Sequence, residues 1–539
     1  FNVTGGNITV QGAGLNAANV DQVDLIARAV QANAAIYANN LNVITGANQV
    51  SHDTLAATPI AGDGAAPGVS IDVSQLGGMY ANRIFLASNE NGVGVSNAGI
   101  IAAQAGDLTL TTQGKLILTG RTTASGNMAV SAARGVDNSG TTYAQQSVSV
   151  NTRDALTNSG TLAAQQDLIV NAGSVASTGT LGAGISNDGS IAQSGDLSVN
   201  ATGALSATGR NAAGGNTTLQ GASIDLSGST TSANGNLALN ASRGDLNLSD
   251  ATSTAGGTAN ASASGTLTND NGALSSGGAQ TITAGALSNR SGQIVSGDTL
   301  TANVADAVSN QGGTIQAAGA LNAHAGSLDN TAGHVASLNA DSLAFSTAGL
   351  LNNGAAGTIG GNGSVTVQAG QIANTGSITA VQNLTASALQ TLSNRGTLAA
   401  NGNVNASAGT TLTNSGSIAA GQELTASAAT LDNSAGSIGA DQLALTAANL
   451  TNHSGTITQT GTGATTIAVS GTLDNTNGSL QTNAANLTLG PAMLVNDHGT
   501  IANSGNGTLS VNTGSLSNNS GTLATNGALN IQAGTVSNR

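Results

Sequence analysis

The sequence predicts an all-β solenoid, a parallel β-helix with about 20 residues per coil. Three observations predict this fold. A phrase of the form apolar-x-Asn returns about every 20 residues and is followed by a short Gly-bearing turn and then by Ile, Leu or Val. Within each repeat, apolar residues alternate with small polar ones. Finally, 39% of the residues are hydrophobic but only 1% are aromatic, so the core must be narrow and filled by Ala, Leu, Ile and Val.

The recurring Asn is the most regular feature of the second half of the chain. Asn is a good corner residue because it tolerates left-handed backbone geometry and hydrogen-bonds its own turn, and stacked Asn side chains can form a ladder. A ligand-binding role is the alternative. We therefore predict a structural turn role for the Asn of each repeat: Asn269, Asn289, Asn310, Asn330, Asn374, Asn394, Asn414, Asn433, Asn452, Asn475, Asn496 and Asn518. The phrases that end at Asn352 and Asn538 belong to the same series.

Short alternating segments, such as residues 107–111, 196–200 and 236–240, predict the strands. A period of two indicates a strand with one buried face. Stacking equivalent strands at about 4.8 Å would give a rod on the order of 110 to 130 Å long. In this arrangement Leu392 and Leu412 take equivalent inward positions in neighbouring coils, and Thr413 faces outward.

The first hundred residues are less regular. Residues 21–40 begin with helix-compatible residues, which predicts a short helical turn before strands resume at Ile36. Residues 51–68 contain Pro59 and Pro67 and predict a surface loop. Regular repeats begin after Asn97.

Two blocks in this irregular region resemble a known family. The first, from Asp24 to Val50, reads DLIARAVQANAAIYANNLNVITGANQV, and the second, from Gly77 to Gly99, reads GGMYANRIFLASNENGVGVSNAG. They resemble the latter part of the two-partner-secretion domain that opens exoproteins of the filamentous haemagglutinin family. The array behind them resembles the haemagglutinin repeats of the same family. The resemblance assigns residues 1–99 to the C-terminal part of the secretion domain and residues 100–539 to a β-helical shaft.

The resemblance also implies a right-handed β-helix, export through an outer-membrane two-partner-secretion transporter, and a secreted fibre at the bacterial cell surface. Such fibres are adhesins, or stalks of contact-dependent growth inhibition proteins that deliver a toxin. The Asn-Pro-Asn motifs of the family are absent, so the chain is expected to begin downstream of them. It stops within a repeat at Arg539, so receptor-binding and toxin regions, and contact with a host-cell or neighbouring-bacterium receptor, are expected to lie outside it.

One tripeptide, Arg243-Gly244-Asp245, has the sequence that integrin-binding adhesins display on loops. Gly-Asp-Leu also occurs at Asp107 and Asp196, each time before an alternating strand, so the alternative is that Gly244 and Asp245 belong to the repeat pattern. A turn at this position predicts a positive φ at Gly244.

Composition argues against several functions. The net charge of −14 leaves no basic stripe for nucleic acid, and the absence of Cys removes thiolate chemistry. Glycoside cleavage needs paired carboxylates, and sugar grooves use aromatic platforms, but the chain has three Phe, three Tyr and no Trp. We therefore expect no enzyme, no cofactor and no metal site. A shaft that spaces a distal module is the first hypothesis, and a shaft that itself binds glycans or proteins is the second.

Overall fold

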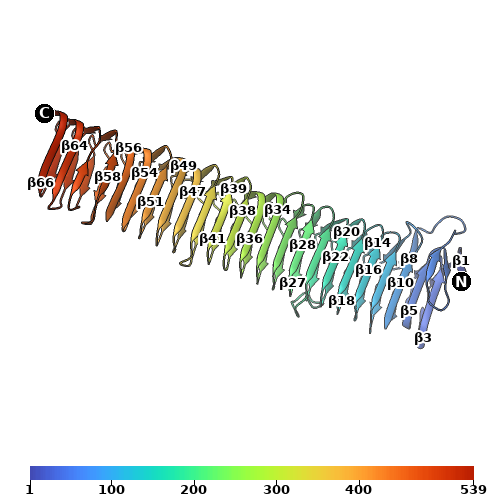
Figure 1. The fold of residues 1–539 in the computed structure, drawn as a ribbon. Helices are drawn as coiled ribbons and strands as arrows, with labels where there is room; N and C mark the ends of the chain where they lie inside the picture. The colour runs from blue at the N-terminus through green and yellow to red at the C-terminus, as the bar shows by residue number, and fades with distance from the viewer. The chain divides into compact units, whose positions relative to one another are not determined.

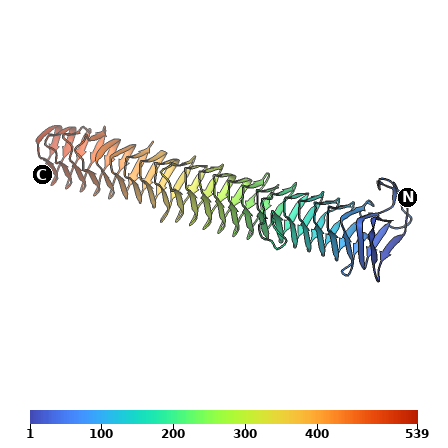
Figure 2. The same ribbon diagram turned by 90° about the horizontal axis from the view of Figure 1, so that it is seen from below.

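The computed structural model describes all residues from Phe1 to Arg539, which form strands and no helix (Figure 1). The chain forms two compact units, Phe1–Gly278 and Ala279–Arg539. Within each unit the strands pair in parallel with the equivalent strands of the coils before and after, so each unit is a β-solenoid. Figure 2 shows the stacked strands of each unit from below. The predicted all-β parallel solenoid is confirmed. No helix is present that is long and apolar enough to cross a bilayer.

A coil of the first unit has three strands, one on each side. One coil consists of β16 (Met128–Ala132), β17 (Val136–Asn138) and β18 (Thr141–Ala144). The next consists of β19 (Val148–Thr152), β20 (Ala155–Asn158) and β21 (Thr161–Ala164). Residues 20 positions apart are partners, as in Met128 with Val148 and Thr141 with Thr161. The coil length inferred from the sequence is therefore the spacing between stacked strands.

The second unit has the same organisation, with some strands running through a corner. β49 (Leu384–Asn394) spans the positions of β51 (Val404–Ala408) and β52 (Thr411–Asn414) of the next coil, and β50 (Thr397–Ala400) pairs with β53 (Ser417–Ala420). Leu392 lies opposite Leu412, and the two side chains are 1% and 0% exposed. Thr413 is half-buried on the outer side of the strand. The predicted strand phase is confirmed at these positions.

The core of each unit is a narrow column of stacked aliphatic side chains. Leu, Ile, Val and Ala dominate it, and the one buried Phe is Phe345. Gly lets the coils approach closely at the turn that follows the Asn of the repeat. A Cβ at Gly396 would collide with the carbonyl oxygen of Gly376, and one at Gly416 would collide with that of Gly396. These turns therefore require Gly for contact between coils.

The N-terminal region departs from the sequence prediction at two places. No helical turn forms in residues 21–40, because this segment lies in β3 (Leu15–Ala27), β4 (Ala29–Ala32) and β5 (Ala35–Thr45). Val23 and Leu25 pair with Leu41 and Val43 of the next coil, and this tertiary pairing overrides the local helix preference. The predicted loop at residues 51–68 contains a short strand, β7 (Ala57–Pro59). It forms an antiparallel sheet with β6 (Asn48–Val50) and β1 (Asn2–Val3), seen near the N-terminus in Figure 1.

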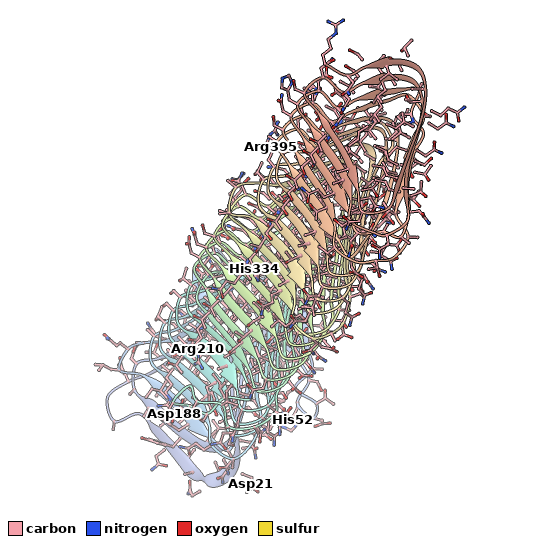
Figure 3. The ribbon with its side chains drawn as sticks, turned by 90° about the vertical axis from the view of Figure 1, so that its left-hand side faces the viewer. Asp21, His52, Asp188, Arg210, His334 and Arg395 are labelled. Atoms are coloured by element: carbon pink, nitrogen blue, oxygen red, sulfur yellow. The ribbon has the colours of Figure 1, made fainter.

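One insertion interrupts the repeats of the first unit. Residues 184–196 lie between β24 (Thr180–Ala183) and β25 (Leu197–Ala201), and the register partners Leu168 and Leu197 are 29 residues apart instead of about 20. The insertion folds on itself through an antiparallel bridge between Ile185 and Ile191. Arg210 holds it by donating from Nη1 to the carbonyl oxygen of Gly189 at 2.9 Å. Figure 3 shows Asp188 of the insertion and Arg210 on the same side of this unit.

Candidate functional site

The Asn residues of the repeat form a buried ladder in the second unit. The amide nitrogen Nδ2 of each Asn donates to Oδ1 of the Asn in the next coil, over distances of 2.7–3.0 Å. The rungs in chain order are Asn289, Asn310, Asn330, Asn353, Asn374, Asn394, Asn414, Asn433, Asn452, Asn475, Asn496, Asn518 and Asn538. Asn269, in the first unit, is also fully buried.

The rungs from Asn289 to Asn496 also bond the backbone of the next coil, whereas Asn518 bonds the carbonyl oxygen of Gly521 in its own turn. Nδ2 of Asn374 donates to the carbonyl oxygen of Thr397 at 3.0 Å, and Nδ2 of Asn394 donates to that of Ser417 at 2.9 Å. Both hydrogens of the amide are therefore used inside the protein, and its oxygen accepts from the coil before. A side chain that is buried and fully bonded in this way has nothing left to offer a ligand.

Two details of the Asn prediction are wrong. The left-handed backbone does not lie at the Asn itself but two residues later, as at Ala435 (φ 57°) after Asn433 and at Ser454 (φ 52°) after Asn452. Asn433 and Asn452 directly follow a strand, β54 (Glu423–Asp432) and β56 (Gln442–Thr451), and the chain turns the corner in the residues behind them. The phrase that ends at Asn352 is also shifted by one residue: Leu351 is buried, and Asn353 occupies the ladder.

The first unit contains a shorter piece of the same ladder, which the sequence reasoning missed. Asn138 donates to Oδ1 of Asn158 at 2.8 Å, and Asn158 donates to Oγ of Ser177 at 3.0 Å. Ser177 takes the rung after Asn158, and the register partners at either end of this piece are Leu118 and Ala207, so the ladder is interrupted here. The signal for this piece is the same phrase, which occurs at Val136-Asp137-Asn138 and Leu156-Thr157-Asn158. Asn211 donates to Oγ1 of Thr231 at 3.1 Å in a different column, at the second position of β27 (Arg210–Ala213), where the coil before has Leu181.

The tripeptide at Arg243 lies on the surface, but both charged side chains contact other coils. Arg243 donates from Nη2 to the carbonyl oxygen of Thr202 at 2.7 Å, and Oδ1 of Asp245 accepts from the backbone N–H of Thr266 at 2.8 Å. Gly244 does not have a positive φ, so that prediction is wrong. Gly244 instead continues the coil-to-coil bonding, with its carbonyl oxygen accepting from the N–H of Gly265 at 3.0 Å.

The contact that Asp245 makes recurs at the other Gly-Asp-Leu sequences. Oδ1 of Asp107 accepts from the N–H of Asn127 at 2.8 Å, and Oδ1 of Asp196 accepts from the N–H of Asn216 at 2.7 Å. In each case an acidic side chain at the start of a strand caps the backbone of the next coil. Asp245 thus makes the same contact as two residues that are not part of an Arg-Gly-Asp sequence.

A buried ion pair fastens the irregular N-terminal region. Arg28 donates from Nη2 to Oε1 of Glu90 at 2.7 Å and from Nε to Oε2 at 3.1 Å, and its Nη1 donates to the carbonyl oxygen of Asp63. The hydrogen bond from Arg28 lowers the pKa of Glu90, and the bond to Glu90 raises the pKa of Arg28. The pair joins a solenoid corner, the segment that follows β7 and the turn at residues 89–93.

Comparison with protein families identifies the chain. The TPS secretion domain matches residues 1–118. The haemagglutinin repeat matches six overlapping segments: residues 123–192, 180–250, 232–307, 276–355, 331–416 and 396–490. The chain belongs to the filamentous haemagglutinin family of two-partner-secretion exoproteins. Filamentous haemagglutinin-type exoproteins are secreted and displayed at the bacterial surface, so this chain is part of a secreted surface protein.

Several relatives within the family are much longer than this chain. It is 50% identical to the "tRNA nuclease CdiA-2" of Burkholderia pseudomallei (strain 1026b) over all of its own length but only 18% of that protein. It is 45% identical to the "Toxin CdiA" of Yersinia pestis over 43% of its length and 7% of that protein. A "16S rRNA endonuclease CdiA" of Enterobacter cloacae is 47% identical over 25% of the chain and 4% of that protein. No solved structure matches.

Proposed function

We propose that this chain is the shaft of its parent exoprotein and holds a separate effector region away from the cell surface. The observation that carries the proposal is the Asn ladder of the second unit, in which the side chains from Asn289 to Asn518 are buried and hydrogen-bond successive coils to one another. A solenoid of this kind gains its stability from contacts between neighbouring repeats, so coils can be added without changing those already formed. The number of coils can therefore set the distance between the effector region and the cell surface.

The N-terminal region serves export in this proposal. We assign residues 1–99 to the C-terminal part of the secretion domain and residues 100–539 to the shaft. The partner during export is an outer-membrane two-partner-secretion transporter. The match of residues 1–118 to the TPS secretion domain supports this assignment.

The names of the relatives favour a stalk that delivers a toxin over a plain adhesin. The three relatives described above are named as nucleases and toxins, and this chain covers 18% or less of the length of each. The exposed residues of its described coils form a repeating polar surface without an evident catalytic cluster. We therefore assign no catalysis to the shaft and place toxin activity and receptor binding in other parts of the parent protein.

Coil deletion in the full-length parent protein tests the shaft role. Removing residues 397–416 joins Gly396 to Ser417, and Ser417 then meets Ser377 in the register that Thr397 occupies now. Secretion and surface display should persist, and inhibition of neighbouring bacteria should fall stepwise as further whole coils are removed. Unchanged inhibition after the loss of many coils would contradict the shaft role.

A matched variant separates spacing from sequence recognition. Replacing the exposed residues Asn401, Asn405 and Thr410 by Lys keeps the number of coils and all buried residues and changes only the exposed surface. Activity should equal that of the unaltered protein. If this exchange is as harmful as the deletion, this part of the array recognises a partner, and spacing does not explain its role.

A further inference from the structure

All three tyrosines of the chain lie in one outward-facing column of the first unit. Tyr37 of β5 is the register partner of Tyr80 on β9 (Gly78–Ala81), and their rings stack with centroids 5.2 Å apart and planes 16° apart. The column continues through Ala102 on β12 (Ile100–Ala103) and Thr123 on β15 (Arg121–Ala124) to Tyr143 on β18. Three tyrosines in the whole sequence are too few to predict an aromatic groove, but the solenoid gathers them on one side.

The small residues between the tyrosines leave a pocket. Ala102 and Thr123 form the floor, Tyr80 lies at one end and Tyr143 at the other, and the volume is about 440 Å³. This is within the range of roughly 300–1,000 Å³ that is typical of small-molecule sites.

The polar lining of the pocket consists of amides, hydroxyl groups and one guanidinium. Gln104, Gln145 and Asn187 line it, with the exposed guanidinium of Arg121 at the start of β15. No side-chain hydrogen bond or ion pair occupies Arg121, since only its backbone groups are bonded. Amide side chains both donate and accept hydrogen bonds, and Arg121 adds donors.

The insertion at residues 184–196 closes one end of the pocket. The hydroxyl of Tyr143 donates to the carbonyl oxygen of Ile185 at 3.3 Å, and its ring packs with Ile185 and Ala163. Tyr143 is only 7% exposed as a result. The insertion therefore builds an end wall, with Asn187 on it, for a pocket that is already formed without a ligand.

We infer that this pocket binds a neutral oligosaccharide. Sugar rings offer C–H faces that pack on tyrosine rings, and their hydroxyl groups donate and accept as the surrounding amides do. This inference goes beyond the shaft role and does not depend on it.

Two other ligand classes fit the pocket less well. A peptide that adds as a strand needs an unpaired sheet edge, but β9, β12, β15 and β18 are each paired on both sides. An acidic ligand would approach Asp188, whose pKa the bonds from Ser186 and Ser190 lower to about 2, in a chain of net charge −14. Arg121 is the one cationic group in the lining.

The test uses the whole chain and two panels of soluble oligosaccharides. The neutral panel contains cello-, malto- and chito-oligosaccharides and lactose-based sugars, and the acidic panel contains sialyllactose and heparin fragments. Saturation-transfer NMR should detect binding of at least one neutral sugar, and titration calorimetry should then give its affinity. Absence of neutral binders, or binding of acidic sugars alone, would overturn the inference.

Substitutions in and outside the pocket test whether the sugar binds there. Ala102→Trp fills the floor and should weaken binding at least tenfold, whereas Ala238→Trp, at an outward position of β31 (Leu237–Ala241), should leave it unchanged. Gln104→Ala and Gln145→Ala change exposed side chains only, so they report on the pocket even if the Trp variant fails to fold. Unchanged affinity in both Gln variants and in a folded Ala102→Trp protein would show that the sugar binds elsewhere.

Discussion

The side chains of Asn374 and Asn394, 20 residues apart, are joined by a buried hydrogen bond of 2.7 Å from Nδ2 of the first to Oδ1 of the second. In the same way, Nδ2 of Asn394 donates to Oδ1 of Asn414 at 2.8 Å. The direction of donation is the same at every rung of the second unit, because each amide nitrogen faces the following coil. Each position of the ladder therefore requires an amide side chain, and it requires that the amide nitrogen point toward the following coil.

Changing one rung to a carboxylate should break the ladder. In Asn394→Asp, a carboxylate oxygen replaces the nitrogen that faces Oδ1 of Asn414 and the carbonyl oxygen of Ser417, and the charge is buried. We expect a local loss of roughly 3 kcal/mol or more. Hydrogen exchange of the amides in the neighbouring coils should rise accordingly. Asn405→Asp, at an exposed position of β51, is the control and should change exchange little.

The strand phase can be tested with one substituent at adjacent positions. Leu412→Asn buries an amide in place of an aliphatic side chain and should cost about 2–5 kcal/mol locally. Thr413→Asn places the same side chain on the outer face and should cost little. Asn is preferable to Asp here, because Thr413 is the register partner of Asp432. Urea titration followed by circular dichroism measures both variants, and equal damage would show that the assigned phase is wrong.

The role of the Arg-Gly-Asp tripeptide can be separated from its charge. Asp245→Asn keeps the oxygen that accepts from the N–H of Thr266, so folding and any adhesion of the fragment to cells should be unchanged. Asp245→Ala removes the acceptor and should raise hydrogen exchange at Thr266. Adhesion that is lost in Asp245→Asn, with an intact circular-dichroism spectrum, would instead assign recognition to this carboxylate.

The ion pair between Arg28 and Glu90 should make the N-terminal region sensitive to acid. The pKa of Glu90 is lowered in the folded protein. Its carboxylate therefore contributes fully to stability above the unfolded pKa of about 4.3, and this stability is lost as the pH falls through the lower pKa of the folded state. The N–H of Asp63, bonded to the carbonyl oxygen of Thr4 at 2.8 Å, is a reporter. Its hydrogen exchange, corrected for the intrinsic pH dependence, should rise below about pH 4.

Glu90→Gln supplies the comparison for this pH dependence. The variant should show raised exchange at Asp63 already at neutral pH and no further change through the acidic range. Glu423→Gln, at an exposed position, should behave as the unaltered chain. If hydrogen exchange at Asp63 has the same pH profile in the unaltered chain and in Glu90→Gln, the ion pair is not the cause of the acid sensitivity.

The sequence by itself determined the repeat length, the strand phase and the composition of the core. These follow from local periodicity: Leu392 and Leu412 are inward because apolar residues recur with period two inside a strand and about 20 between coils. The Asn series also marked one position per coil in most repeats of the second unit, because the apolar-x-Asn phrase recurs there with little interruption. At Leu350 and Leu351, two neighbouring apolar residues left the phase ambiguous by one position.

Only the tertiary structure decided which distant residues meet. The helix-compatible residues after Asp21 became strands because Val23 and Leu25 have partners in the next coil. Arg28 and Glu90 are 62 residues apart, and no local sequence pattern predicts their contact. The tyrosine column depends on coil lengths between Tyr37 and Tyr143 that differ from the mean period, so their alignment appears only when each strand is placed in register. Stacking fixes these relations because hydrogen bonds between coils, rather than sequence separation, set which side chains share a face.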